Sequence, residues 1–273
     1  MIEQKKLIEA VKARAIADEN VSALMMYGSF TQGCGDEYSD VEFYVFVKDE
    51  AMDGFSGAEW IAGVHPYFTH FFNEFGTEVV IFKNLVRGEF HFMLDSAMEV
   101  IESFKGQAYF PDVKAMNLYD SSGRLAAYLK KLDGVVPEYN DAQTIDFLID
   151  NAFNNIIMGL NVLARGEIAR SFELLWFVQR YLLQLFRIKE DSTLHWLNMY
   201  KNLENEISQG SYHSFIDCTA RPQKKELLAA YGNAIDNIEN LWRELNKTYG
   251  LKNYAELFKA AGAVIKGLDV SGA

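Results

Sequence analysis

The sequence has 273 residues, 49% hydrophobic and 23% charged, which suffices for one large globular domain or two smaller ones. Its formal net charge at pH 7 is −12. An acidic balance argues against a nucleic-acid partner, because binding to phosphate backbones needs a surplus of Lys and Arg. A neutral or cationic small molecule is the expected partner.

The two cysteines and the apolar segments exclude several further classes. Cys34 and Cys218 lie far apart without any Cys-x-x-Cys spacing, so neither a disulfide framework nor a zinc site is expected. Residues 1–6 mix charges and lead into no uninterrupted apolar run, which argues against a secretory signal. The most apolar stretch, 174–188, contains two arginines and two glutamines and is too polar to span a bilayer. We expect a cytoplasmic protein without a membrane partner.

The first part of the chain mixes strand-like and helix-like patterns. An amphipathic helix is predicted at 4–17 and an aromatic-rich helix at 60–75, whose aromatic side chains are expected in the core. β-Branched and aromatic runs predict strands at 23–27, 40–47, 77–82 and 88–93. This part is therefore interpreted as a mixed sheet with helices on one face.

The pattern changes near 134–141, and long helical periods dominate from there on. Asp141 is the expected N-cap of the first helix, and Gly166, Gly210 and Gly250 are expected helix stops. The five predicted helices span 141–165, 167–190, 194–208, 223–249 and 253–267. The predicted fold class is α+β, with a mixed sheet and its helices in domain 1–135 and a helical bundle in domain 141–273.

The most informative segment joins a Gly-Ser pair to two carboxylates. Gly28 and Ser29 directly follow the strand predicted at 23–27. A turn there exposes backbone N–H groups and a hydroxyl where no Cβ blocks approach, which suits phosphate oxygens. Asp40 lies eleven residues beyond Ser29, and Glu42 two further on. Since residues two apart on a strand point to the same face, the two carboxylates are expected to converge.

Asp40 and Glu42 together predict a divalent cation, because adjacent carboxylates repel each other unless a cation lies between them. Oxygen ligands beside a phosphate cradle favour Mg²⁺, which takes carboxylates together with substrate phosphates. Two such ions, about 3.5–4 Å apart, would stabilise the attacking and leaving oxygens of an in-line displacement. The expected chemistry is phosphoryl or nucleotidyl transfer. The alternatives are a plain turn at Gly28-Ser29 and a strand-edge cap at Asp40.

A third carboxylate is expected from a neighbouring strand, and Glu78 and Glu89 are the candidates. Glu89 shares its strand face with the polar His91, whereas Glu78 shares its face with Val80. Alternation therefore favours Glu89, both as a metal ligand and as the acceptor of a proton from an attacking hydroxyl. Glu78 stays the alternative.

Three further residues are candidates with open roles. Arg170 is either a phosphate clamp for the nucleotide or a solvated, salt-bridged arginine. Tyr44 lies on the same strand face as Asp40 and Glu42, so it either borders a substrate site or packs in the core. His91 is either a substrate contact or a partly buried histidine.

Several runs of sequence resemble the polymerase-β-type nucleotidyltransferase superfamily, in which a Gly-Ser turn precedes an acidic pair on the next strand. The closer resemblance is to the lincosamide nucleotidyltransferases of the LinB-like branch, and it extends over nearly the whole chain. The runs that carry it are 25–31, 38–44, 76–82, 87–92, 158–163, 165–167, 169–171, 196–199 and 201–204.

The resemblance implies an antibiotic-resistance enzyme that transfers AMP from ATP to a hydroxyl of a lincosamide such as lincomycin or clindamycin and releases pyrophosphate. It implies Gly28 and Ser29 on the triphosphate, Asp40 and Glu42 on Mg²⁺, and Glu89 as metal neighbour or general base. It also implies a nucleotidyltransferase catalytic domain followed by a bundle that contributes to the substrate site. Glu42 in place of a second aspartate is a variation that these antibiotic-modifying members share.

Two alternatives to this function stay open. One is an aminoglycoside nucleotidyltransferase, which shares the core motif and prefers cationic acceptors. The other is a nucleotide-binding regulatory module of the antitoxin type that turns over no drug. The aromatic-rich segments permit a homodimer without requiring one.

Overall fold

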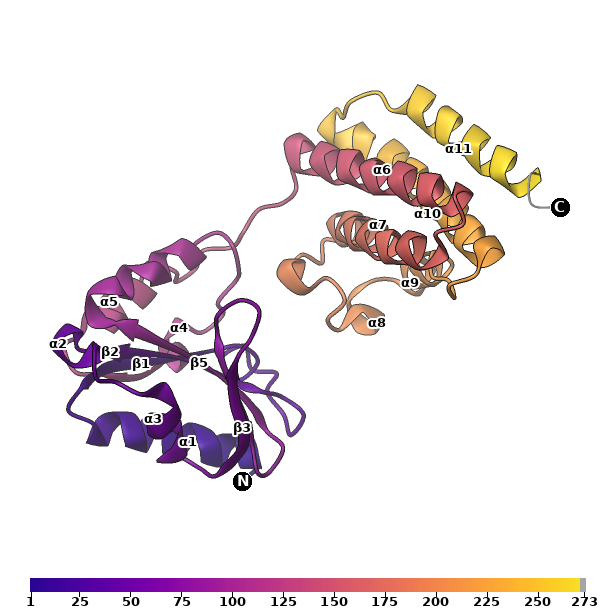
Figure 1. Ribbon diagram of the computed structural model, residues 1–273. Coiled ribbons are helices and arrows are strands. Elements are labelled where there is room, and N and C mark those ends of the chain that lie inside the picture. Colours follow the sequence, from indigo (N-terminus) through magenta and orange to yellow (C-terminus); the bar gives the residue numbers. More distant parts are fainter. Residues whose placement is uncertain (271–273) are drawn as a thin grey trace. The chain divides into compact units, whose positions relative to one another are not determined.

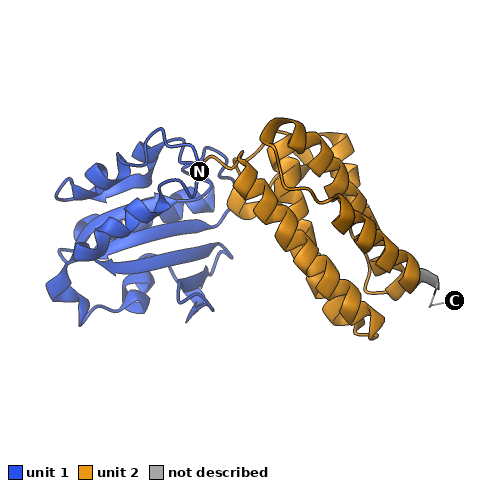
Figure 2. Ribbon diagram, turned by 90° about the horizontal axis from the view of Figure 1, so that it is seen from above, with its two compact units in different colours: residues 1–137 blue, residues 138–273 orange. Residues whose placement is uncertain are grey.

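The computed structural model describes residues 1–270, and the chain divides into two compact units, 1–137 and 138–273 (Figure 2). The last three residues of the predicted domain 141–273 lie outside the described residues. Each unit has its own hydrophobic core. The predicted α+β class is confirmed, because a mixed sheet with helices is followed by a purely helical unit.

Unit 1 contains a six-stranded sheet with the strand order β3-β4-β5-β2-β1-β6 (Figure 1). Strands β2 and β5 are parallel, and the other neighbouring pairs are antiparallel. Because β2 and β5 lie at the centre in parallel register, residues at their N-terminal ends lie side by side. The strands are β1 (Val21–Tyr27), β2 (Val41–Val47), β3 (Tyr67–Phe72), β4 (Glu78–Phe82), β5 (Arg87–Leu94) and β6 (Asn117–Asp120).

Helices cover both faces of this sheet, which corrects the expectation of helices on one face. One face packs against α1 (Glu3–Ala17), α2 (Asp49–Met52) and α3 (Gly57–Ala62). The other packs against η1 (Asp95–Phe104), α4 (Val113–Met116) and α5 (Arg124–Leu129). Figure 1 shows α1 and α3 below the sheet and α5 above it. The reason lies in β1, in which six consecutive residues are buried, since a strand without a polar face needs cover on both sides.

The prediction of a helix at 60–75 is wrong beyond residue 62. Helix α3 ends at Ala62, and β3 begins at Tyr67 directly after Pro66. Proline lacks the N–H that a helix interior needs and disfavours helical geometry in the residue before it, while aromatic residues suit a strand. Of the aromatic side chains expected in the core, Trp60 is buried. The others are exposed on the edge strand or its turn: Phe68, Phe71, Phe72 and Phe75.

Four of the five predicted helices are present in unit 2. They are α6 (Ala142–Ala164), α7 (Ile168–Lys189), α10 (Lys224–Tyr249) and α11 (Ala255–Val270). Asp141 is the N-cap of α6, since its Oδ1 accepts a hydrogen bond of 2.8 Å from the Thr144 N–H. Gly250 ends α10 in a left-handed conformation with φ +64°.

The helix predicted at 194–208 is replaced by two short elements, η2 (Trp196–Asn198) and α8 (Leu203–Glu206). Arg187 is fully buried in α7 and donates to the carbonyl groups of Ser192, Met199 and Lys201. Because a buried guanidinium needs acceptors, these bonds stabilise the non-helical course of the segment. Gly210 does not stop a helix either, because it lies inside the unpredicted α9 (Gln209–Ile216).

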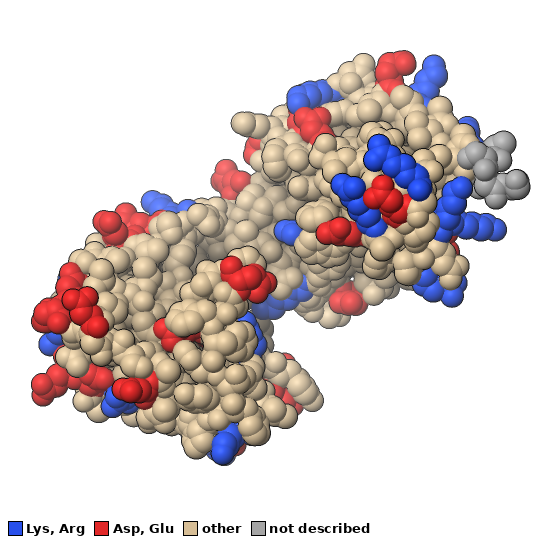
Figure 3. Space-filling view, viewed as in Figure 1, with Lys and Arg blue, Asp and Glu red and all other residues tan. Residues whose placement is uncertain are grey.

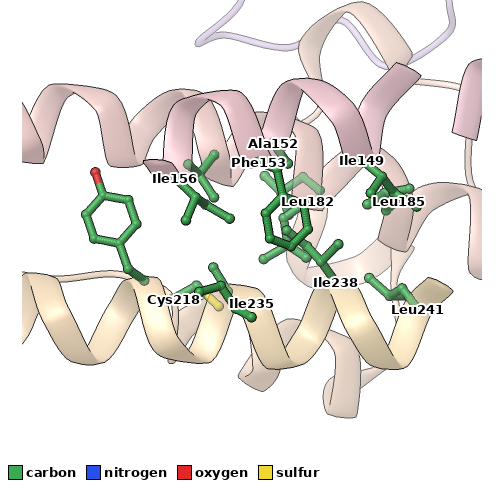
Figure 4. Packing of buried hydrophobic residues seen from close by; sticks show 14 of the residues in the cluster. Ile149, Ala152, Phe153, Ile156, Leu182, Leu185, Cys218, Ile235, Ile238 and Leu241 are labelled. Carbon is green, nitrogen blue, oxygen red and sulfur yellow. The ribbon is translucent and has the colours of Figure 1, made fainter. Parts of the chain in front are cut away.

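The core of unit 2 forms where α6, α7 and α10 pack together (Figure 4). Ile149 and Ile156 of α6, Leu182 of α7 and Ile238 of α10 are fully buried in it. Among the described helices, α6 alone is long and apolar enough to cross a membrane, but 56% of its most apolar window is buried inside the protein. Burial of that kind is typical of a core helix.

Gly159 gives the first testable prediction. An added Cβ at this position of α6 would lie 2.0 Å from Oη of Tyr231, a fully buried residue that donates a hydrogen bond to the Ser171 carbonyl. The Tyr231 side chain would have to move and weaken this hydrogen bond. We therefore expect Gly159→Ala to lower the free energy of unfolding of unit 2 by about 1–3 kcal/mol. Urea denaturation measures the change.

The matched control is Gly262→Ala in α11, where no atom lies within 4 Å of the added Cβ. It should be neutral or stabilise the unit by up to about 1 kcal/mol, because alanine is the better helix former. Equal effects of both substitutions would contradict the packing described for Gly159.

Candidate active site

The turn after β1 has the backbone geometry that the Gly-Ser pair predicted. Gly28 has φ +83°, a left-handed conformation that favours glycine, and its carbonyl accepts hydrogen bonds from Thr31 N–H (3.1 Å) and Thr31 Oγ1 (2.8 Å). The Ser29 hydroxyl is buried and has no hydrogen-bond partner among the described residues. A buried polar group of this kind calls for an explanation, and a ligand bound at the turn would supply one.

Asp40, Glu42 and Glu89 come together at one end of the sheet. Asp40 immediately precedes β2, and Glu42 is opposite Tyr27 of β1 on one side and Glu89 of β5 on the other. Residues in register share a face of the sheet, so the Glu42 and Glu89 carboxylates lie on the same face. An added Cβ at Gly28 would be 1.8 Å from Glu42 Oε2, so this carboxylate contacts the turn directly.

Glu78 lies on the opposite face of the sheet. It is in register with Phe90, whose neighbours on that face form the apolar layer under α1 and α3. Its Oε2 is 2.7 Å from Nε2 of His70. The structure therefore brings Glu89, and not Glu78, to Asp40 and Glu42, and the catalytic and metal-binding roles of these three carboxylates stay predictions.

Arg87 is a site residue that the sequence reasoning did not single out. It begins β5, and its Nη1 donates to Asp40 Oδ2 at 2.8 Å while its Nη2 donates to Glu89 Oε1. One guanidinium thus bridges two of the three carboxylates, and these bonds keep its pKa above the ordinary range. Its position two residues before Glu89 could have identified it, because residues two apart lie on the same strand face.

Carboxylate oxygens are the type of ligand that Mg²⁺ prefers, but these carboxylates do not converge on one metal position. Within residues 1–270, no three Asp, Glu, His or Cys side chains are close enough together to hold a metal ion. Asp40 and Glu89 instead share the cation of Arg87. A metal–triphosphate complex fits here, because Glu42 contacts the turn and the Ser29 hydroxyl has no partner among the described residues. Such a complex requires Arg87 to release Asp40 and Glu89.

Tyr44 and His91 lie further along the same face, behind the carboxylates. Their rings stack at a centroid distance of 4.3 Å with 9° between planes, and Tyr27 Oη lies 3.1 Å from His91 Nε2. Burial, reinforced by the charges of Glu42 and Glu89, raises the pKa of Tyr27, so this phenol keeps its proton. Tyr27 is the second residue near the site that was not predicted from the sequence. Its position directly before Gly28 could have indicated it.

Arg170 belongs to unit 2, in the first turn of α7. Its side chain is 55% exposed, and Nη1 lies 3.4 Å from Glu167 Oε2. Arg170 and the other predicted site residues thus belong to different units. Its contact with a nucleotide stays a prediction, as do the substrate contacts of Tyr44 and His91.

The negative charge of the chain is concentrated in the unit that carries the carboxylates. Residues 1–137 include 21 acidic and 12 basic side chains, against 17 and 14 in residues 138–273. On the face drawn in Figure 3, acidic side chains gather at one edge of unit 1, while basic side chains are frequent on unit 2. An acidic unit around the site favours cationic ligands and disfavours polyanions.

The helical half of the chain matches a family model for the C-terminal domain of antibiotic-modifying nucleotidyltransferases. The description of that family is "Lincosamide nucleotidyltransferase-like, C-terminal domain", and the match covers residues 141–261. The match confirms the resemblance predicted from the sequence. It relates the chain to nucleotidyltransferases of the antibiotic-resistance type.

Two solved structures are similar to the whole chain at low identity. An aminoglycoside 6-adenyltransferase from Bacillus subtilis has a TM-score of 0.45 and 11% identity, with 98% of this chain and 99% of that chain covered. A nucleotidyltransferase-like protein from Exiguobacterium sibiricum 255-15 has a TM-score of 0.41 and 10% identity, with 89% and 77% covered. At such low scores neither likeness says what this chain does. No curated protein matches the sequence.

The half-buried His91 gives a prediction for the pH dependence of stability. Burial lowers the pKa of His91 from its ordinary value of 6.5, and the nearby Glu89 offsets this only in part. Below pH 6.5 the unfolded chain therefore binds more protons at this residue than the folded chain. The free energy of unfolding should fall as the pH falls through this value toward the folded-state pKa.

His91→Gln removes this titration, so unit 1 of the variant should lose less stability than the wild type between about pH 7 and pH 5. Urea denaturation at several pH values measures the difference, with the exposed His213→Gln of unit 2 as control. If His91→Gln and the wild type lose stability in parallel over this range, the account of a half-buried imidazole that resists protonation is wrong.

Proposed function

We propose that the protein transfers AMP from ATP to a hydroxyl of a lincosamide antibiotic and releases pyrophosphate. The observation that carries the proposal is the convergence of Asp40, Glu42 and Glu89 on one sheet face, with Glu42 in contact with the Gly28-Ser29 turn. The family model that matches residues 141–261 supports nucleotidyl transfer as the reaction class and suggests a lincosamide as the acceptor.

The turn binds the triphosphate in this proposal. Backbone N–H groups around the left-handed Gly28, together with the Ser29 hydroxyl, would donate to its oxygens. Asp40, Glu42 and Glu89 would hold Mg²⁺, which neutralises phosphate charge and stabilises the oxygens at the reacting phosphorus. Tyr44 and His91 would contact a substrate beside the carboxylates, and Arg170 would bind the nucleotide from the helical unit.

Glu89 accepts the proton of the acceptor hydroxyl in the proposed reaction. The hydroxyl oxygen forms a bond to the α-phosphorus of ATP, and the bond from that phosphorus to the bridging oxygen of the β-phosphate breaks. The electron pair of this bond leaves with pyrophosphate, and AMP stays on the acceptor. For Glu89 to take the proton, its bond to Arg87 must open.

An aminoglycoside is the second candidate acceptor, because the surplus of acidic residues in unit 1 suits a polycationic substrate. Lincosamides carry one amine and aminoglycosides several. The acidic surplus of unit 1 therefore suits both kinds of acceptor.

The direct test incubates the protein with ATP, Mg²⁺ and, separately, lincomycin, clindamycin and kanamycin, and measures product mass. We expect lincomycin and clindamycin to gain one AMP, with pyrophosphate released. Asp40→Asn should abolish the transfer, and Glu89→Gln should lower turnover about a hundredfold or more while ATP affinity changes little. AMP on kanamycin alone would identify the second candidate, and no product with any acceptor would reject transfer to these antibiotics.

Gly28→Ala tests the contact between the turn and Glu42. The added methyl would displace the Glu42 carboxylate, so we expect turnover to fall by about a hundredfold with the fold retained. Gly33→Ala is the matched control, since Gly33 has φ +76° in the same turn region but no atom within 4 Å of an added Cβ. Equal losses in both variants would attribute the effect to backbone strain instead of Glu42.

A further inference from the structure

We propose that Arg87 is a resident counter-ion that excludes divalent cations from Asp40 and Glu89 until a metal arrives together with the nucleotide. The inference rests on the proposed function and extends it to a residue that positions the carboxylates. Its basis is the bridge that one guanidinium makes between two strands, from the first residue of β5 to Glu89 two residues on and to Asp40 before β2.

The bridge has a specific geometry, and it is exposed enough for another cation to replace Arg87. Two different nitrogens of Arg87 bind the two carboxylates, a fork that a lysine side chain cannot reproduce. The side chains are 40% (Arg87), 38% (Asp40) and 18% (Glu89) exposed. Ion pairs that are this exposed contribute little to folding stability, so opening the bridge is not costly for the fold.

Metal and guanidinium compete for the same oxygens. A cation held by Asp40 and Glu89 has to take oxygens that Arg87 now binds, and a guanidinium left beside it would repel it. The competition accounts for the arrangement of the three carboxylates, which are adjacent on one face but not gathered for a metal within residues 1–270. A metal-bound triphosphate on the Gly28-Ser29 turn can shift the balance, because it brings phosphate oxygens that attract the released guanidinium.

The test measures the binding of Mn²⁺ alone, without nucleotide or acceptor, from the electron paramagnetic resonance signal of free Mn²⁺. We expect Arg87→Gln to bind Mn²⁺ at least about tenfold more tightly than the wild type, because a positive charge is removed from the site. Arg87→Lys keeps the charge but loses the fork, so its Mn²⁺ affinity should lie between those of the wild type and Arg87→Gln. A purely structural role of Arg87 would leave Mn²⁺ affinity unchanged or lower it.

Two further variants locate the effect. Arg124→Gln removes another ion-paired arginine of unit 1, one that binds Asp95 instead of the three carboxylates, and should leave Mn²⁺ affinity unchanged. Asp40→Asn added to Arg87→Gln should abolish the gain. Circular dichroism checks the fold, and Arg87→Met, which keeps the apolar stem, replaces Arg87→Gln if that variant does not fold.

Unchanged or weaker Mn²⁺ binding in the neutral Arg87 variants overturns the inference, and so does a gain that survives Asp40→Asn. The assay needs no turnover, so its outcome is separate from that of the proposed function. A protein that transfers AMP but shows no gain in Mn²⁺ affinity refutes the role of Arg87 alone. A protein that transfers nothing but shows the gain refutes the transfer reaction alone.

Discussion

Repulsion between like charges at one end of β2 and β5 is the constraint on which the rest of the site depends. Parallel register sets Glu42 beside Glu89, and Asp40 adds a third carboxylate at the start of β2. Negative charges so close together on one face need a cation. Arg87 supplies it for two of the three in the protein alone, and the proposed reaction requires a metal-bound nucleotide to take over this role.

Much of this site follows from local patterns in the sequence. Strand alternation favoured Glu89 over Glu78, and the register of β2, β4 and β5 sets Glu89, and not Glu78, beside Glu42. The bridge of Arg87 to Asp40 joins residues 47 positions apart. It depends on which strands pair and in which register, and local residue spacing does not reveal pairing between distant segments.

The errors in the predicted fold have different physical causes. The aromatic spacing at 60–75 and the apolar spacing at 194–208 are both compatible with helices, but neither segment forms one long helix. Pro66 and pairing with β4 turned the first segment into an edge strand, and the hydrogen bonds of the buried Arg187 held the second in short turns. The long helices of unit 2 were predictable, because their apolar stripes and caps act locally.

A crystal structure with Mn²⁺ and a non-hydrolysable ATP analogue tests the central claim most directly. The account predicts anomalous density for Mn²⁺ between Asp40 and Glu42, triphosphate oxygens within hydrogen-bond distance of Ser29 Oγ, and Arg87 released from Asp40. A nucleotide bound elsewhere, or Mn²⁺ with no ligand among Asp40, Glu42 and Glu89, would contradict it.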